Sequence, residues 1–322
     1  MKISSETLTT QAEATGFRPD MLEKVALLLQ LLDAIRSHPF LKERLVLKGG
    51  TALNLFIFDV PRLSVDIDLN YVGAADGETM LGERPRVEEA LQAVFAREGY
   101  TVRRVPTEHA GGKWQLRYPS VGGQGGNLEV DVNFMFRIPL WPVQWIDSRP
   151  VGIWHAAGIP VVDVHELAAG KLSALLSRRQ ARDLFDCSNF FRLGGLDRER
   201  LRLAFVVYGA MSRKDWRTIA PEDVDIDTAD LEQKLIPTLR SAGSEKIRKN
   251  QFGKGLVEDC CSLLSSLLPF TAPEQGFLDR ILDRGEIAPE LLTSDEALQN
   301  RIRRHPLLEW KAVNVRGHKK GR

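Results

Sequence analysis

The sequence predicts an α+β fold in which a sheet with helices is followed by an α-helical C-terminal domain. Two segments, residues 63–72 and 128–136, alternate polar and apolar side chains as a half-buried strand does. After Pro160 the pattern changes to apolar residues at helical spacing. We therefore predict one domain over residues 1–155 and a helical domain over residues 156–322.

Glycines and prolines divide the first half of the chain into short elements. The expected helices cover residues 18–38, 51–58 and 85–98, and the expected strands cover residues 45–47, 63–72, 113–119 and 128–136. Four glycines between residues 122 and 126 favour a hairpin between the last two strands. Residues 139–160 are rich in proline and tryptophan, so we expect irregular structure and the domain boundary there.

Helices account for the second half. They are expected over residues 163–178, 181–192, 197–208, 230–242, 255–267, 274–284 and 295–303. Asp163 and Glu166 have the spacing of a capping box at the start of the first of these helices. The basic tail, residues 311–322, is expected to fray.

Composition excludes several classes of protein. The formal net charge is +1, so any nucleic-acid binding must depend on a local basic patch rather than on a global field. Cys187, Cys260 and Cys261 have neither a disulfide pattern nor the spacing of a zinc site. No apolar run approaches the roughly 18 residues of a membrane span, and the first residues lack a signal peptide. We expect a cytoplasmic protein.

The chemistry is concentrated in residues 47–69, which join a glycine turn to a pair of aspartates. Asp66 and Asp68 are two residues apart, so a strand places both carboxylates, and Ser64 before them, on one face. Two like charges side by side favour a bound cation, and Mg²⁺ prefers carboxylates together with substrate phosphates. The turn Gly49-Gly50-Thr51 offers backbone N–H groups to a phosphate. This combination indicates phosphoryl or nucleotidyl transfer.

A second strand carries acidic residues on its polar face. Glu129 and Asp131 alternate with apolar neighbours, and Asp131 is the better candidate to join Asp66 and Asp68 if the two strands are adjacent. Three carboxylates could hold two metal ions about 3.5–4 Å apart. The alternative is a charge on an edge strand that discourages aggregation.

A cationic cluster follows in the helical half. Lys171, Arg178, Arg179 and Arg182 lie within twelve residues, and Asp183 and Asp186 share a helix face. Such cations can neutralise charge on a leaving pyrophosphate. The alternative is that these charges form an ordinary solvated helix surface. The position of Lys171 beside an apolar stripe argues against that alternative.

Taken together, these motifs resemble a known family. Residues 48–53, residues 62–69, Lys171 with Arg178, and residues 182–186 are similar in order and spacing to the AbiEii/AbiGii nucleotidyltransferase toxins, including the MenT-like branch. The resemblance covers residues 45–192. It implies a DNA polymerase β-like nucleotidyltransferase core, a mixed sheet with flanking helices, followed by a helical domain that contributes Lys171 and Asp183 to the active site.

The resemblance also implies roles for single residues. Asp66 and Asp68 would bind Mg²⁺, or Mn²⁺ in its place, while Asp131 as a third ligand rests mainly on the strand argument. Lys171 would contact the nucleotide phosphates, and Asp183 would be the acidic residue of the last motif, supported by Asp186. The remaining nucleotide-binding candidates are Lys48, Gly49, Gly50, Thr51, Ser64, Arg178 and Arg182.

A member of this family would be the toxin of a toxin–antitoxin system. It would move NMP from an NTP to the 3′ end of tRNA and so block translation, and its antitoxin would often carry a winged-helix domain. Three alternatives stay open: transfer of nucleotide or phosphate to a protein hydroxyl, a non-catalytic nucleotide-binding toxin, and a Mg²⁺-dependent phosphohydrolase.

A tRNA acceptor would need a basic surface in the helical half. Trp216 could stack on an unpaired base. The cationic candidates are Arg178, Arg179, Arg213, Lys214, Arg217, Lys246, Arg248, Lys249 and Lys254. His109 and His165 are expected to be structural or surface residues rather than catalytic bases.

Overall fold

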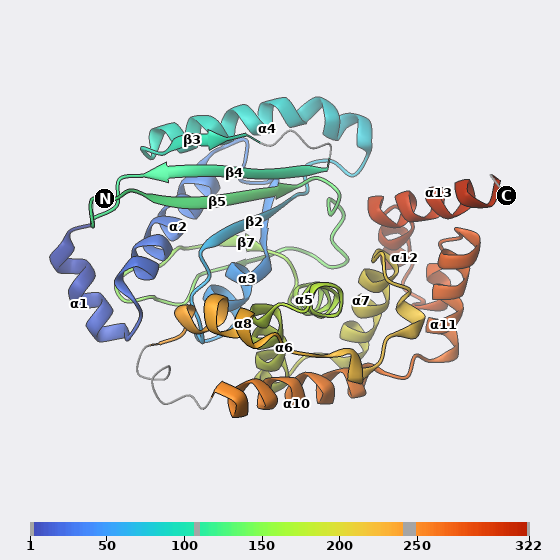
Figure 1. The fold of residues 1–322 in the computed structure, drawn as a ribbon. Coiled ribbons are helices and arrows are strands. Elements are labelled where there is room, and N and C mark those ends of the chain that lie inside the picture. Colours follow the sequence, from blue (N-terminus) through green and yellow to red (C-terminus); the bar gives the residue numbers. More distant parts are fainter. Residues whose placement is uncertain (1–2, 106–109, 241–248, 321–322) are drawn as a thin grey trace. The chain divides into compact units, whose positions relative to one another are not determined.

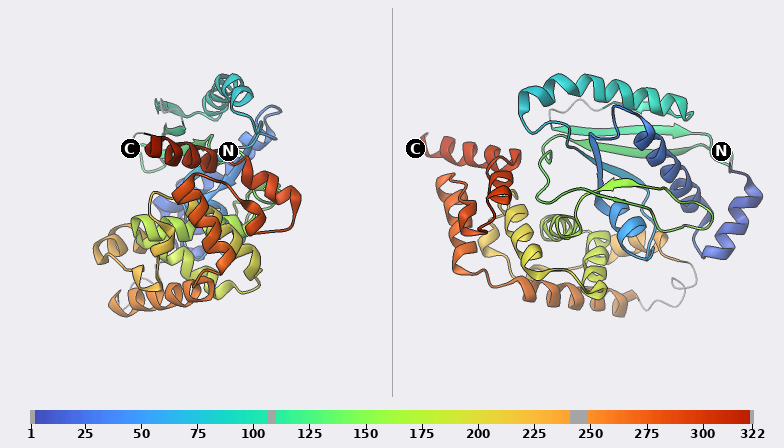
Figure 2. Two further views of the ribbon diagram at one scale, coloured as in Figure 1. Left: turned by 90° about the vertical axis from the view of Figure 1, so that its right-hand side faces the viewer. Right: turned by 180° about the vertical axis from the view of Figure 1, so that it is seen from behind.

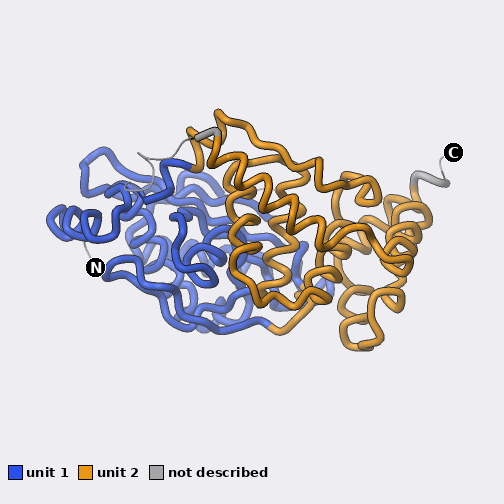
Figure 3. The backbone as a smooth tube through the Cα atoms, turned by 90° about the horizontal axis from the view of Figure 1, so that it is seen from below, with its two compact units in different colours: residues 1–137, 143–162, 236–247 blue, residues 138–142, 163–235, 248–322 orange. Residues whose placement is uncertain are grey.

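The protein divides into two compact units (Figure 3). The computed structural model describes residues 3–105, 110–240 and 249–320. Unit 1 comprises Met1–Arg137, Val143–Val162 and Ile236–Ile247, and unit 2 comprises Ile138–Pro142, Asp163–Leu235 and Arg248–Arg322. The boundary predicted at residue 155 therefore falls inside unit 1, and the chain passes between the units more than once.

Unit 1 is built on a mixed, seven-stranded sheet of order β3-β4-β5-β2-β1-β7-β6. Figure 1 labels β2, β3, β4, β5 and β7 of this sheet. The strands are β1 (Leu45–Lys48), β2 (Asp66–Tyr71), β3 (Thr101–Arg104), β4 (Gly111–Tyr118), β5 (Gly126–Asn133), β6 (Gln144–Ile146) and β7 (Ile159–Val161). The pairs β2–β5 and β1–β7 are parallel, and the other neighbours are antiparallel. The predicted hairpin is confirmed as β4–β5.

Helices pack on this sheet through apolar stripes. Unit 1 contains α1 (Ser5–Thr15), α2 (Pro19–Ser37), α3 (Gly49–Ala52) and α4 (Gly77–Arg97). The α2 helix begins with Pro19, which suits a first helical position, and lies against β2, β5 and β7 (Figure 2). Leu29 of α2 is buried, as are Ile67 of β2 and Val130 of β5. Each such side chain contributes roughly 1.5–3 kcal/mol of burial free energy, so this face of the sheet is the core.

Two predictions in unit 1 were wrong. The α4 helix begins eight residues before Pro85, because Asp76 caps it by accepting a hydrogen bond from the Thr79 N–H, and Pro85 lies inside the helix. The segment 139–160, expected to be irregular, contains β6 and the start of β7.

Unit 2 is helical, as predicted. Its helices are α5 (Val164–Arg178), α6 (Ala181–Leu193), α7 (Arg198–Ala210), α8 (Thr228–Asp230), α10 (Lys249–Leu267), α11 (Ala272–Asp279), α12 (Glu296–Arg303) and α13 (Pro306–Lys320). The helix expected over residues 230–242 is confirmed as far as Thr238, because α8 continues without a break into a π-helical segment (Leu231–Leu235) and a 3-10 segment (Ile236–Thr238). The run ends there, and residues 241–242 lie outside the described residues. Within those residues, no helix is long and apolar enough to cross a membrane.

The tail does not fray over residues 311–320, where α13 continues instead. Leu308 and Ala312 are buried, and Arg316 donates to the carbonyl oxygen of Gly285 over 2.6 Å. The tertiary contacts of unit 2 therefore override the polar composition of this segment.

The predicted cap of α5 is half correct. Asp163 is the N-cap and accepts from the His165 N–H at 2.9 Å. Glu166 does not complete a capping box, because one oxygen of its carboxylate accepts from the N–H groups of Leu140 and Trp141 at 2.9 and 3.2 Å. Glu166 therefore binds the separate segment Ile138–Pro142 to α5.

Candidate active site

The two carboxylate strands lie side by side in unit 1. Parallel pairing of β2 with β5 places Asp66 opposite Glu129 and Asp68 opposite Asp131. Residues directly opposite each other point to the same face of a sheet. The adjacency on which the prediction for Asp131 depended is thus present, and four carboxylates share one face of the sheet.

This acidic group lies between two lysines. Lys48 of β1 is in register with Asp68, and Lys113 of β4 is in register with Asp131. The four strands therefore carry a cross-strand row of Lys48, Asp68, Asp131 and Lys113. Strands lie about 4.7–4.9 Å apart, so neighbouring members of this row are close enough to interact.

Lys113 is a residue that the sequence did not single out. Its Nζ lies 2.8 Å from Oε2 of Glu129, and its side chain is 49% exposed. The pKa of Lys113 is raised, chiefly by the hydrogen bond to Glu129 and then by the charges of Glu129, Asp66 and Asp68. The signal in the sequence was only one lysine at a polar position of an alternating strand.

The glycine turn presses its backbone against the Asp68 carboxylate. Gly49 has φ +73°, and a Cβ placed there would lie 2.3 Å from Oδ2 of Asp68. Glycine is thus required twice, for its conformation and for the close approach. The β1–α3 turn and the carboxylates consequently form one compact structure.

Thr51 and Ser64 are more deeply placed than the sequence suggested. Thr51 is fully buried, and its hydroxyl donates to the backbone carbonyl of Asp66. Ser64 is also buried. Thr51 therefore fixes the turn relative to β2, and the groups of the turn that are suited to a phosphate are its backbone N–H groups and Lys48.

The donor set of this face fits a divalent cation that shares its ligands with a substrate. Among the described residues, no three His, Cys, Asp or Glu side chains converge closely enough to hold a metal ion without other ligands. Mg²⁺ usually takes only one or two carboxylates from a protein and completes its shell with phosphate oxygens and water. Asp66 and Asp68, on one strand face, match that requirement.

A separate ionic network lies in unit 2, between α5 and α6. The Nζ atom of Lys171 lies 2.9 Å from Oδ1 of Asp183 and 2.8 Å from Oδ2 of Asp186. Arg178 adds two bonds to Asp183, at 2.6 and 3.0 Å. Burial alone would raise the pKa of Asp183, which is 1% exposed, but the charges of Lys171 and Arg178 outweigh burial and lower it. The cations expected at a nucleotide thus also hold two buried aspartates.

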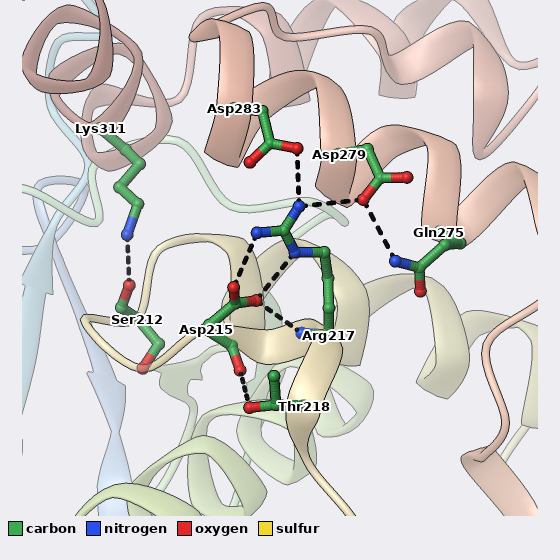
Figure 4. A network of polar contacts seen from close by, with 8 residues as sticks. All are labelled: Ser212, Asp215, Arg217, Thr218, Gln275, Asp279, Asp283 and Lys311. Carbon is green, nitrogen blue, oxygen red and sulfur yellow. Dashed lines mark hydrogen bonds and ion pairs between the residues drawn. The ribbon is translucent and has the colours of Figure 1, made fainter. Parts of the chain in front are cut away.

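Among the described residues, the basic surface predicted in the helical half is present only in part. Trp216 is fully buried, so the prediction that it stacks on a base is wrong. Arg217 is bound by the carboxylates of Asp215, Asp279 and Asp283 at 2.7, 3.1 and 2.7 Å (Figure 4).

Other predicted cations vary in their surroundings. Lys214 pairs with Asp223 at 2.8 Å. Arg179, Arg213 and Lys254 are exposed, whereas Arg182 is half-buried. Lys246, Arg248 and the side chain of Lys249 lie outside what the structure describes.

His165 has the structural role that was expected of it. Nδ1 of His165 lies 2.9 Å from Oδ1 of Asp163, and its Nε2 accepts from the Asp197 N–H at 3.0 Å. Both ring nitrogens are therefore used within unit 2, which confirms a structural role. His109 lies outside the described residues.

Comparisons with known proteins bear on the family and the fold of the chain. The family model described as "Nucleotidyl transferase AbiEii toxin, Type IV TA system" matches residues 30–303. Among solved structures, the chain is similar to MenT4, a nucleotidyltransferase toxin from Mycobacterium tuberculosis, with a TM-score of 0.58 and 19% identity. That match covers 98% of this chain and 100% of MenT4. A search of curated protein sequences finds no match.

Proposed function

Because the chain belongs to the AbiEii family of nucleotidyl transferase toxins, we propose that it transfers NMP from an NTP to the 3′ end of tRNA and so blocks translation. The observation that carries the proposal is the row of Lys48, Asp68 and Asp131 across three strands beside the Gly49 turn. The mixed sheet of unit 1 is also compatible with a DNA polymerase β-like core.

The residues of unit 1 would divide the work on the nucleotide. The backbone N–H groups of Gly49 and Gly50 and the ammonium of Lys48 would receive the triphosphate. Asp66 and Asp68 would hold Mg²⁺, or Mn²⁺ in its place, and Asp131, opposite Asp68, would add negative charge beside the ion rather than serve as a third ligand. When bound, the ion would neutralise phosphate charge and lower the pKa of the acceptor hydroxyl. Thr51 would keep the turn in register with β2.

Lys171 and Asp183 would serve the same reaction from unit 2. Their support is the resemblance of their sequence motif to the family, their place within residues 30–303 that the family model matches, and the ion pairs that fix the Lys171 ammonium. Arg178 and Arg182 would add positive charge for the phosphates, and Asp183 would act as a positioning residue for Lys171 and Arg178.

The partner implied by the family is an antitoxin, because the family description places its members in a type IV toxin–antitoxin system. We propose that this antitoxin carries a winged-helix domain. Its expression beside the toxin should restore growth of cells that the toxin alone arrests.

The decisive experiment incubates the protein with total tRNA, Mg²⁺ and each α-³²P-labelled NTP in turn. We expect label on RNA with the wild type and only background label with Asp68→Asn, because that variant keeps the shape of the side chain and removes its charge. Asp20→Asn is the matched control, since Asp20 forms a surface pair with Arg18 whose loss costs about 0–1 kcal/mol.

Circular dichroism of each variant separates loss of chemistry from loss of fold. Full transfer by a folded Asp68→Asn variant would contradict the assigned role of the carboxylates. Label on protein instead of RNA would contradict the tRNA acceptor and leave the nucleotidyltransferase in place.

A further inference from the structure

The sheet order gives the candidate site two distinct sides. The carboxylates lie on β2 and β5, in the middle of the order β3-β4-β5-β2-β1. Lys48 and the Gly49 turn lie on the β1 side, where the triphosphate is proposed to bind. In phosphoryl and nucleotidyl transfer the attacking and leaving oxygens are roughly in line. An acceptor must therefore approach from the side opposite the leaving pyrophosphate, over β4 and β3.

The side over β4 and β3 is polar, exposed and basic. Alternation along β4 places Lys113, Gln115 and Arg117 on the carboxylate face, because Trp114, Leu116 and Tyr118 fill the core. Register with β3 adds Thr101 opposite Arg117, and Arg104 opposite Gln115. All five polar residues are exposed. We call this group, Thr101, Arg104, Lys113, Gln115 and Arg117, the β3–β4 face.

Its charge complements a polynucleotide. Lys113 already pairs with Glu129, at the edge of the acidic group. Arg104 and Arg117 lie farther out, and no carboxylate in the described part of the chain forms an ion pair with either. In the surface predicted in unit 2, Arg217 and Lys214 are paired with aspartates and Trp216 is buried, whereas Arg179, Arg213 and Lys254 are exposed.

We propose that the β3–β4 face binds the single-stranded 3′ end of the RNA acceptor through its backbone phosphates, an inference that rests on the proposed transferase function. Arg104 and Arg117 contact phosphates, and Lys113 lies where the strand reaches the carboxylates. The acidic group repels a continuous phosphate backbone, so an RNA strand aligned on this face ends there with its terminal hydroxyl. The face therefore favours a free 3′ end over an internal hydroxyl.

The test measures the affinity of the full-length protein for a short, fluorescein-labelled single-stranded RNA with a free 3′ hydroxyl, by anisotropy over a range of salt. We expect Arg104→Gln/Arg117→Gln to bind about tenfold more weakly at low salt. For single-stranded nucleic acid, each phosphate contact adds about 0.7 to the steepness of the plot of log affinity against log salt concentration. Because the variant removes two such contacts, its plot should be less steep than that of the wild type by about 1.4. In transfer assays, KM for RNA should rise while kcat at saturating RNA holds.

The matched control is Arg18→Gln/Arg97→Gln, which removes two exposed arginines from the N-terminus of α2 and the last turn of α4. It should keep wild-type affinity and salt dependence, and both double variants should bind NTP as the wild type does. Unchanged RNA affinity in Arg104→Gln/Arg117→Gln, with transfer still lost in Asp68→Asn, would overturn the inference and leave the proposed function intact. Binding of an acidic peptide but not RNA to this face would also overturn it.

Discussion

Gly49 links the backbone of the β1–α3 turn to the chemistry of β2 because it has no side chain. Its φ of +73° is costly for any other residue, and a Cβ would meet the Asp68 carboxylate at 2.3 Å. We expect Gly49→Ala to lower the free energy of unfolding by about 1–3 kcal/mol and to abolish transfer, because Asp68 must move. Urea denaturation and the labelled-NTP assay measure the two effects.

Gly82 provides the contrasting glycine in the same unit. It lies within α4, and a Cβ there would have no neighbour within 4 Å. Gly82→Ala should raise stability by about 0.5–1 kcal/mol, as alanine does in a helix interior, and leave transfer unchanged. If Gly49→Ala proved as stable and as active as Gly82→Ala, the close approach of Gly49 to Asp68 would be shown to matter for neither stability nor transfer.

The pair α5–α6 depends on its internal ions. Asp183→Asn removes a buried charge and breaks its ion pair with Lys171, whose pair with Asp186 at 2.8 Å remains. Breaking such a buried pair typically costs about 3–5 kcal/mol, so we expect a large drop in the urea midpoint together with loss of transfer. Arg178→Met should cost far less stability, because Arg178 is 54% exposed. Equal losses in the two variants would contradict the buried-network account.

Strand identity could be predicted from the sequence, but strand neighbours could not. Alternation around Asp68 and Asp131 was enough to place both residues on polar strand faces. Their register is a tertiary property that joins positions far apart in the chain. Lys113 could not be identified from the sequence for the same reason. A single lysine in an alternating strand looks like an ordinary solvated residue, and only the pairing of β4 with β5 places it opposite Asp131.

Trp216 shows why the local charge pattern around a residue can mislead. Charged neighbours on both sides, Lys214, Asp215 and Arg217, suggested an exposed aromatic residue. In the structure the ring centroids of Trp216 and Phe205 lie 5.1 Å apart. The indole occupies space that Gly209 of α7 leaves open because it has no side chain. A Cβ at position 209 would lie 2.0 Å from the indole Nε1. The burial of Trp216 therefore depends on Gly209, seven positions earlier in the chain, and not on the charged residues next to Trp216 in the sequence.

The dependence of stability on pH should combine two buried acids of unit 2 that shift in opposite directions. The pKa of Asp183 is lowered, so its stabilisation is present above the unfolded value of about 3.8 and lost as pH falls through the folded value. Burial raises the pKa of Glu166 to about 7, against the lowering effect of the Leu140 and Trp141 N–H groups and the Tyr208 hydroxyl. Its stabilisation is fully present below about pH 4.5 and lost as pH rises through 7.

These opposite shifts predict greatest stability in mildly acidic solution, with the alkaline loss assigned to Glu166. A shift from 4.5 to about 7 corresponds to a loss of roughly 2–3 kcal/mol in the free energy of unfolding between pH 5 and pH 8. Glu166→Gln should remove most of that loss, because an amide keeps an acceptor for the Leu140 N–H and never ionises. Urea denaturation at both pH values measures the slope, with Glu290→Gln, an exposed acid, as the control. An unchanged slope in Glu166→Gln would assign the alkaline loss to another group, and Ile138–Pro142 would then be held to α5 by a carboxylate that stays charged.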